Sequence, residues 1–132
     1  MRSVLLDTNA YAALLRGDDR VRVAVESAER VLMSVFVLGE LHAGFRRGSK
    51  LTQNLRILGE FLLQPTVSVL DATRETAEVF GHVKQTLTRA GRPIPITDVW
   101  IAAHAVDTGS VVVSFDRHFL EVPGLRVWPE LV

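Results

Sequence analysis

Four carboxylate side chains stand close to the ends of predicted strands or at the starts of predicted helices. Asp7 directly follows the apolar run Val4-Leu5-Leu6, and Asp116 lies just past a second apolar run, 111–114. Glu40 and Asp98 fall within the first turn or two of predicted helices. Open α/β sheets bind ligands beyond the carboxyl ends of their strands, where the strand order reverses. If the two strands are neighbours, Asp7 and Asp116 point into one crevice.

Converging carboxylates imply a particular chemistry. Without a nearby lysine they repel one another, which raises their pKa values. A divalent cation relieves the repulsion, and a site made only of oxygen ligands suits Mg²⁺ or Mn²⁺. Each acid also has a simpler interpretation: Asp7 and Asp116 as caps, Asp98 as a partner of a helix dipole, Glu40 as a solvated side chain. Spacing alone leaves both interpretations open.

Other catalytic groups are few. The chain has no cysteine, and its histidines are spread over different predicted elements, at positions 42, 82, 104 and 118. No serine or cysteine nucleophile is paired with a histidine, so we expect direct attack by water on any substrate. His118, near Asp116, is a candidate for phosphate contact. Candidates for contact with an RNA backbone are Arg46, Arg47, Arg89 and Arg92, although each of these five residues also has an ordinary structural or solvated interpretation.

Apolar runs bounded by turn residues alternate with helical patterns. Continuous apolar strands separated by helices are typical of a parallel sheet covered on both faces, so the fold class is α/β. Two prolines place 91–95 in a loop, while Ser34 and Asp71 are the expected caps of the helices that follow them. The predicted strands are 4–6, 31–33, 66–70, 111–113 and 125–128, and the predicted helices are 10–16, 20–29, the segment after Ser34 to Arg47, one beginning near Gly48-Ser49, 73–89 and 97–106. Core packing is expected for Phe36, Phe45, Phe61 and Phe80.

Length and composition further restrict the number of domains, the location and the ligands of the protein. At 132 residues and 48% hydrophobic, the chain is expected to form one domain, residues 1–132. The short N-terminal apolar run is no signal peptide, no run approaches a membrane span, and the expected location is the cytoplasm. The net charge is +0, from 15 basic and 15 acidic residues. Setting aside the four acids leaves 15 basic against 11 acidic residues, a net of +4 on the remainder, so RNA binding stays possible.

Four motifs resemble those of PIN domains, in order and over the whole chain. The segment 4–9, Val-Leu-Leu-Asp-Thr-Asn, looks like the opening motif, and 40–44, Glu-Leu-His-Ala-Gly, resembles the Glu-Leu-x-x-Gly helix. Segment 91–103, which contains Pro-Ile-Thr-Asp, is similar to the third motif and is the most specific of the four. The closing motif corresponds to 113–119 followed by Pro123-Gly124-Leu125. The length matches VapC-type toxins of bacterial toxin–antitoxin pairs.

The resemblance implies a three-layer α/β/α fold with a parallel sheet ordered 3-2-1-4-5, a homodimer, and Mg²⁺- or Mn²⁺-dependent cleavage of single-stranded RNA. It also implies inhibition by a cognate antitoxin protein. By matched position, the metal-binding and catalytic acids are Asp7, Glu40, Asp98 and Asp116, and the supporting hydroxyl groups are those of Thr8 and Ser114. Some relatives carry a further acid near the last motif. Here Phe115 and Arg117 flank Asp116, and Glu121 is the nearby acid, which leaves one or two metals open.

Two other functions compete with this interpretation. One is phosphoryl transfer through an aspartyl-phosphate on Asp7. Haloacid dehalogenase-like enzymes need Asp-x-Asp there, but Asn9 takes the second position, and the lysine that response-regulator receivers need is missing from 111–119. The other is a catalytically inactive PIN fold that only binds a partner. Loss of acids is its expected sign, and all four acids are present.

Overall fold

The computed structural model describes residues 2–131 and is built on a five-stranded sheet in which every neighbouring pair is parallel. The strand order is β3-β2-β1-β4-β5, as expected. The first strand of the chain therefore lies at the centre, and the order reverses between β1 and β4. The strands are β1 Ser3–Leu6, β2 Arg30–Ser34, β3 Val67–Leu70, β4 Val111–Val113 and β5 Arg126–Val127.

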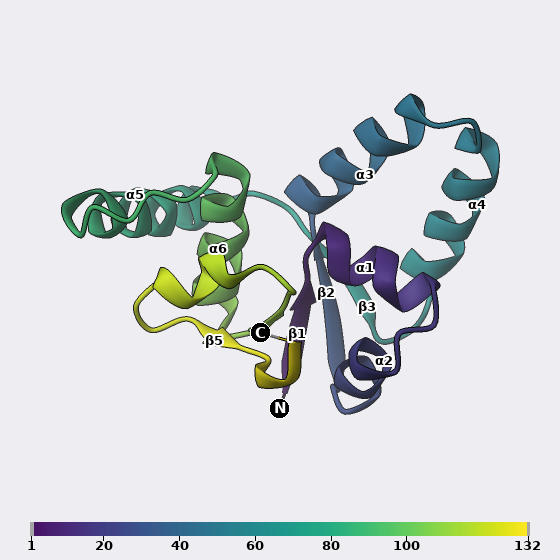
Figure 1. Cartoon of the computed structure of the whole chain (residues 1–132), viewed down its shortest axis with the longest axis horizontal. Coiled ribbons are helices and arrows are strands. Elements are labelled where there is room, and N and C mark those ends of the chain that lie inside the picture. Colours follow the sequence, from purple (N-terminus) through teal and green to yellow (C-terminus); the bar gives the residue numbers. More distant parts are fainter. Residues whose placement is uncertain (1, 132) are drawn as a thin grey trace.

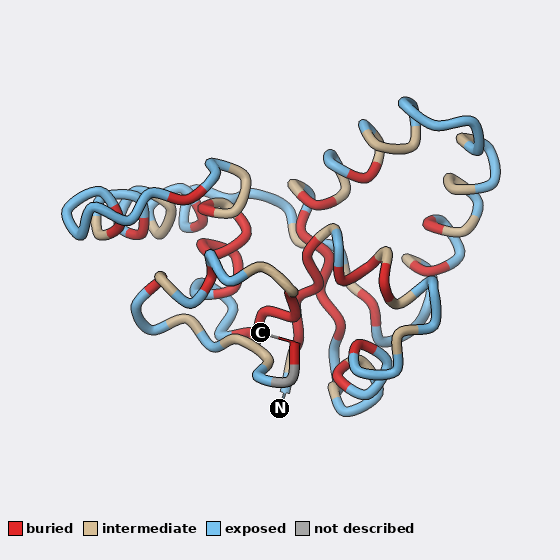
Figure 2. Tube along the Cα trace, viewed as in Figure 1, coloured by how far each residue is buried: buried red, intermediate tan, exposed pale blue. Residues whose placement is uncertain are grey.

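Helices cover both faces of this sheet, in the expected three layers. In Figure 1, α1 to α4 lie to the right of the central strand β1, and α5 and α6 lie to its left. Figure 2 shows the buried residues concentrated in the central strands and the helix faces against them, because strands covered on both sides must be apolar throughout. None of the helices described is long and apolar enough to span a bilayer. The helices are α1 Thr8–Leu15, α2 Asp19–Glu26, α3 Val35–Arg47, α4 Leu51–Leu62, α5 Arg74–Arg89, α6 Ile96–Thr108 and the short 3-10 helices η1 Arg117–Glu121 and η2 Pro129–Leu131.

The register of the two central strands decides where the site forms. Leu6, the last residue of β1, lies opposite Val113, the last residue of β4. The ladder continues one residue further, since the backbone N–H of Asp7 donates to the Val113 carbonyl at 3.3 Å. Asp7 and Ser114 therefore leave adjacent strands at the same level.

A buried polar contact joins the two helices that carry Glu40 and Asp98. Ser34 Oγ caps α3 by accepting a hydrogen bond from the Phe36 N–H at 3.1 Å, and it lies 2.8 Å from Nδ1 of His104 on α6. Ser34 and His104 are both buried. The Phe36 ring stacks on Trp100 of α6, with 4.8 Å between the ring centroids. The start of α3 is thus tied to α6 by a hydrogen bond and an aromatic contact.

The local predictions were mostly confirmed, with corrections at helix starts and ends. Ser34 caps α3, and 91–95 is a loop. The prediction that Asp71 caps α5 was wrong, because Thr73 takes that role in a reciprocal capping box with Thr76. The first helix begins at Thr8 rather than at residue 10, and α2 ends at Glu26, before the predicted 29. The two 3-10 helices were not predicted.

The phenylalanines divide into two groups. Phe61 is buried in the core and makes an edge-to-face contact with Tyr11. Phe45 and Phe80 pack against the core while half-buried, and Phe36 is half-buried in the stack with Trp100. The expectation of core packing thus holds fully for Phe61 and in part for the others.

The Ser34 contact gives a stability prediction. Ser34→Ala removes a helix cap and leaves His104 without this partner in the core, so we expect a loss of about 2–3 kcal/mol of unfolding free energy. Thr73→Ala removes an exposed cap and should cost about 1 kcal/mol. Urea denaturation of the two variants measures both losses. Equal losses would contradict a special role for the Ser34–His104 contact.

Candidate active site

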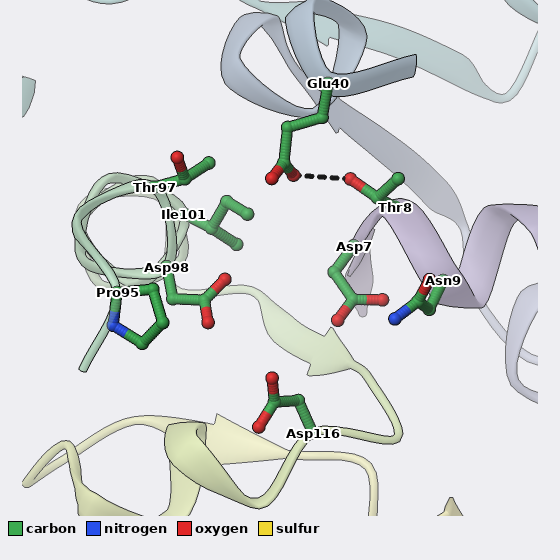
Figure 3. A pocket seen from close by; sticks show the side chains of 9 residues that line it. All are labelled: Asp7, Thr8, Asn9, Glu40, Pro95, Thr97, Asp98, Ile101 and Asp116. Atoms are coloured by element: carbon green, nitrogen blue, oxygen red, sulfur yellow. Dashed lines mark hydrogen bonds between the residues drawn. The ribbon is translucent and has the colours of Figure 1, made fainter. Parts of the chain in front are cut away.

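A cavity of about 290 Å³ opens beyond the carboxyl ends of β1 and β4 (Figure 3). All four predicted acids line it, together with the predicted supporting residue Thr8. The side chains of three acids, Asp7, Asp98 and Asp116, point toward one another, while Glu40 enters from α3 on the opposite wall. No lysine or arginine belongs to the lining. The lining residues are Asp7, Thr8, Asn9, Glu40, Pro95, Thr97, Asp98, Ile101 and Asp116.

Asp7 is both a helix cap and the most deeply placed acid. Its Oδ1 accepts a hydrogen bond from the Ala10 N–H at 2.9 Å, and its Oδ2 accepts one from the hydroxyl group of Ser114. Only 6% of the residue is exposed. Burial raises the pKa of Asp7 from 3.8 to about 6, against the lowering effect of the hydrogen bonds from Ser114 and Ala10, with smaller raising effects from Asp98 and Asp116.

Asp116 follows β4 and is held by the same serine. Ser114 Oγ accepts a hydrogen bond from the Asp116 N–H at 2.9 Å while donating to Asp7. Asp116 Oδ1 in turn accepts from the backbone N–H of His118 at 2.9 Å and so caps η1. Ser114, predicted as a supporting residue, therefore links the two acids at the ends of β1 and β4.

Asp98 and Glu40 come from the two helices tied together by Ser34 and His104. Asp98 is the third residue of α6; burial raises its pKa, opposed by a hydrogen bond from His118, while Asp116 and more weakly Glu40 raise it by repulsion. Glu40 is exposed, and its Oε1 accepts a hydrogen bond from Thr8 Oγ1 at 2.6 Å. The expected rise in pKa is present for Asp7 and Asp98, with burial as its first cause and mutual repulsion a smaller one.

His118 lines a neighbouring cavity rather than the acidic one, yet its ring contacts two of the acids, of which the sequence had indicated only Asp116. Its Nδ1 lies 2.9 Å from Asp116 Oδ1 and 3.3 Å from Asp98 Oδ2. Its position in the short helix η1, which has no sequence periodicity, explains why sequence reasoning linked it only to Asp116. Glu121, the other acid near the closing motif, instead pairs with Arg92. That pair lines a neighbouring cavity of about 340 Å³ and takes no part in the acidic one.

The candidate RNA-contacting arginines lie outside the acidic cavity. Arg46 donates to the His42 carbonyl oxygen of its own helix at 3.0 Å, and Arg92 pairs with Glu121. Arg47 and Arg89 are exposed. Their contact with RNA stays a prediction.

The residues of the cavity fit a divalent cation. Carboxylate oxygens gather there while no basic side chain of the lining offsets their charge. Donor atoms of Asp98, Asp116 and His118 all lie within 4.8 Å of one another. Hard oxygen ligands in such number are typical of Mg²⁺ and Mn²⁺ sites. A parallel sheet with this cavity at its switch point defines an α/β protein built around a carboxylate cluster suited to a cation.

Comparisons with known proteins agree with this class. Residues 4–125 match the PIN domain family. Ribonuclease VapC2 of Haemophilus influenzae is 30% identical, with 96% of each chain covered. The tRNA(fMet)-specific endonuclease VapC of Salmonella typhimurium is 29% identical over 96% of this chain and 97% of its own length. The crystal structure of DNA-bound VapBC from Salmonella typhimurium superposes with a TM-score of 0.84 at 28% identity, covering 97% of this chain and 98% of that one. The chain therefore belongs to the PIN domain family, among its VapC-type members.

The raised pKa of Asp7 predicts how stability depends on pH. The folded state holds a proton on Asp7 more tightly than the unfolded state, so the stability that this group contributes falls as pH rises from 3.8 to about 6. Asp7→Asn keeps a capping side chain without the charge. In the absence of metal it should exceed the wild type by about 1–3 kcal/mol at pH 7 and approach it at pH 4. Denaturation at both pH values measures the difference, and a pH-independent difference would contradict the assignment.

Proposed function

We propose that the chain is an endoribonuclease that hydrolyses phosphodiester bonds of single-stranded RNA with a divalent cation, Mg²⁺ or Mn²⁺. We further propose that residues 1–132 form a single PIN domain that acts in the cytoplasm as the toxin of a toxin–antitoxin pair. The observation that carries the proposal is the convergence of Asp7, Asp98 and Asp116 on a cavity without a basic lining residue, in a chain related to named ribonucleases.

The positions of the four acids in the cavity assign them different roles. Asp7 and Asp116, at the ends of β1 and β4, and Asp98, in the first turn of α6, point toward one another and would hold the cation, with Glu40 facing them across the cavity. A bound divalent cation lowers the pKa of a coordinated water and neutralises charge that develops on the phosphate. Ser114 orients Asp7, and the Thr8 hydroxyl group fixes Glu40 at the mouth of the cavity, where its carboxylate can orient the attacking water.

The histidines argue against the main metal-free alternative. Cleavage by a histidine pair needs two imidazoles acting as acid and base within reach of one phosphate. Among the described residues His118 is the histidine that contacts acids of the cavity, whereas His104 is buried against Ser34, His42 contacts Arg46 and His82 is exposed on α5. Hydrolysis by water at the carboxylate site is the mechanism that these positions support.

We also propose that the chain forms a homodimer and that a cognate antitoxin protein binds it. Solved structures similar to this chain include VapBC of Salmonella typhimurium, at 28% identity, and VapBC-5 of Mycobacterium tuberculosis, a member of the VapBC family of toxin-antitoxin systems. Exposed apolar side chains on the helices that cover one face of the sheet support a protein partner. They include Leu15 of α1, Val23 of α2 and Leu63 directly after α4.

The first test of this function is RNA cleavage by the purified chain. It should cut single-stranded RNA with Mg²⁺ or Mn²⁺ and stop in excess chelator. Asp98→Asn should lower the rate by two or more orders of magnitude, because a half-buried ligand to the cation is lost. Asp107→Asn changes an exposed acid on the same helix and should cleave like the wild type. Undiminished cleavage in chelator would reject a metal-dependent mechanism.

A second test asks whether the activity acts as a toxin in cells. Expression of the wild type alone should arrest bacterial growth, and co-expression of the protein encoded by the adjacent gene should relieve the arrest. Asp98→Asn should be harmless at the same expression level, and Asp107→Asn should arrest growth. A wild type as harmless as Asp98→Asn would favour the catalytically inactive, partner-binding alternative.

A further inference from the structure

His118 occupies a position that a hydrogen-bonding role explains only in part. Its Nδ1 faces two carboxylate oxygens from different elements, Asp98 Oδ2 of α6 and Asp116 Oδ1 after β4. These residues form the one group of three or more potential metal ligands within 4.8 Å of one another found in residues 2–131. Asp7 and Glu40 are not in that group, so the tightest cluster of donor atoms contains a nitrogen.

We propose that His118 is itself a ligand of the cation, binding through Nδ1 beside Asp98 and Asp116, and that it makes the site prefer Mn²⁺ to Mg²⁺. This inference rests on the metal site of the proposed function and adds to it a ligand and a metal preference. It assigns His118 a role distinct from phosphate contact.

The distances match those of neighbouring ligands in a coordination shell. For ligand bonds of about 2.1 Å in an octahedron, adjacent ligand atoms lie roughly 3.0 Å apart and opposite ones roughly 4.2 Å apart. The two contacts of Nδ1, 2.9 Å and 3.3 Å, fall near the adjacent distance. An imidazole that only donates a hydrogen bond to a carboxylate gives similar distances.

The backbone places the ring by fixed contacts. Asp116 Oδ1 accepts from the His118 N–H at 2.9 Å, which locks the start of η1 to the same carboxylate that the ring faces. The next residue, Phe119, is fully buried and anchors η1 in the core. Pre-positioned ligands of this kind lose little freedom on binding a cation. Glu121, the alternative ligand in this motif, is held away by Arg92.

The nitrogen has a consequence for metal choice. Carboxylates and water suit both Mg²⁺ and Mn²⁺, but Mn²⁺ belongs to the first-row transition series and accepts an imidazole nitrogen more readily than Mg²⁺ does. Asp7, Glu40, Asp98 and Asp116 alone would serve either ion. A nitrogen donor from His118 therefore shifts the balance toward Mn²⁺, with the proton of the neutral ring on Nε2.

The experiment measures the bound metal directly, without substrate. Pulsed electron paramagnetic resonance of the Mn²⁺ complex of the whole chain should show coupling to a directly bound nitrogen, and histidine labelled with ¹⁵N should change that coupling. His118→Gln should abolish the signal, whereas the matched control His82→Gln, at an exposed position on α5, should retain it. A wild-type spectrum without nitrogen coupling overturns the inference even if a variant fails to fold.

Titrations with Mn²⁺ and with Mg²⁺ supply the second readout. His118→Gln should weaken Mn²⁺ binding at least about tenfold and Mg²⁺ binding much less, so that the ratio of the two dissociation constants changes. A wild-type Mn²⁺ complex without nitrogen coupling, or an equal loss for both ions, would overturn the inference. Neither result would affect RNA cleavage by an all-oxygen site, and a nitrogen-coupled complex that cleaves no RNA would instead reject the proposed function.

Discussion

The parallel pairing of β1 with β4 is the contact on which the site depends. These strands are far apart in the sequence, yet their last residues, Leu6 and Val113, lie opposite one another. Side chains alternate between the two faces of a sheet. A shift of the register by one residue would therefore place the side chains of Asp7 and Ser114 on different faces. The fully buried apolar side chains of β1 resist such a shift. The packing of the central strands, directly beneath the cavity, thus determines where its carboxylates lie.

Helix caps convert this placement of the backbone into an orientation of side chains. The simpler interpretations of Asp7 and Asp116 as caps are correct, since each carboxylate accepts a hydrogen bond from a backbone N–H at the start of a helix. Capping does not compete with metal binding, because each carboxylate oxygen keeps a second lone pair. The cap holds the carboxylate in one rotamer, and the burial that results raises the pKa of Asp7. A charge held at such a cost is typical of a functional site.

How well the sequence predicts each structural feature depends on how far apart in the sequence the interacting residues lie. Apolar runs and prolines located every strand and the loop 91–95, because their signals are local. The α5 cap was assigned to Asp71 rather than Thr73, since both are good capping residues and the choice depends on the reciprocal bond from Thr76. The Ser34–His104 contact joins residues 70 positions apart and has no local signal. The four acids were located through family motifs, whereas spacing alone left each of them open.

The net charge of the whole chain does not show how it can bind a polyanion. The chain is neutral, but four of its acids face one cavity, so the rest of the molecule carries a net charge of +4. Before a cation binds, the cavity repels a phosphate group while the surrounding surface attracts one. A bound divalent cation would reverse the sign of the electrostatic potential in the cavity alone, where the phosphate group is repelled. Binding of the metal and binding of an RNA phosphate should therefore favour each other, and by linkage each raises the affinity for the other by the same factor. A neutral composition is then compatible with a nuclease, provided that its acids are concentrated where the cation sits.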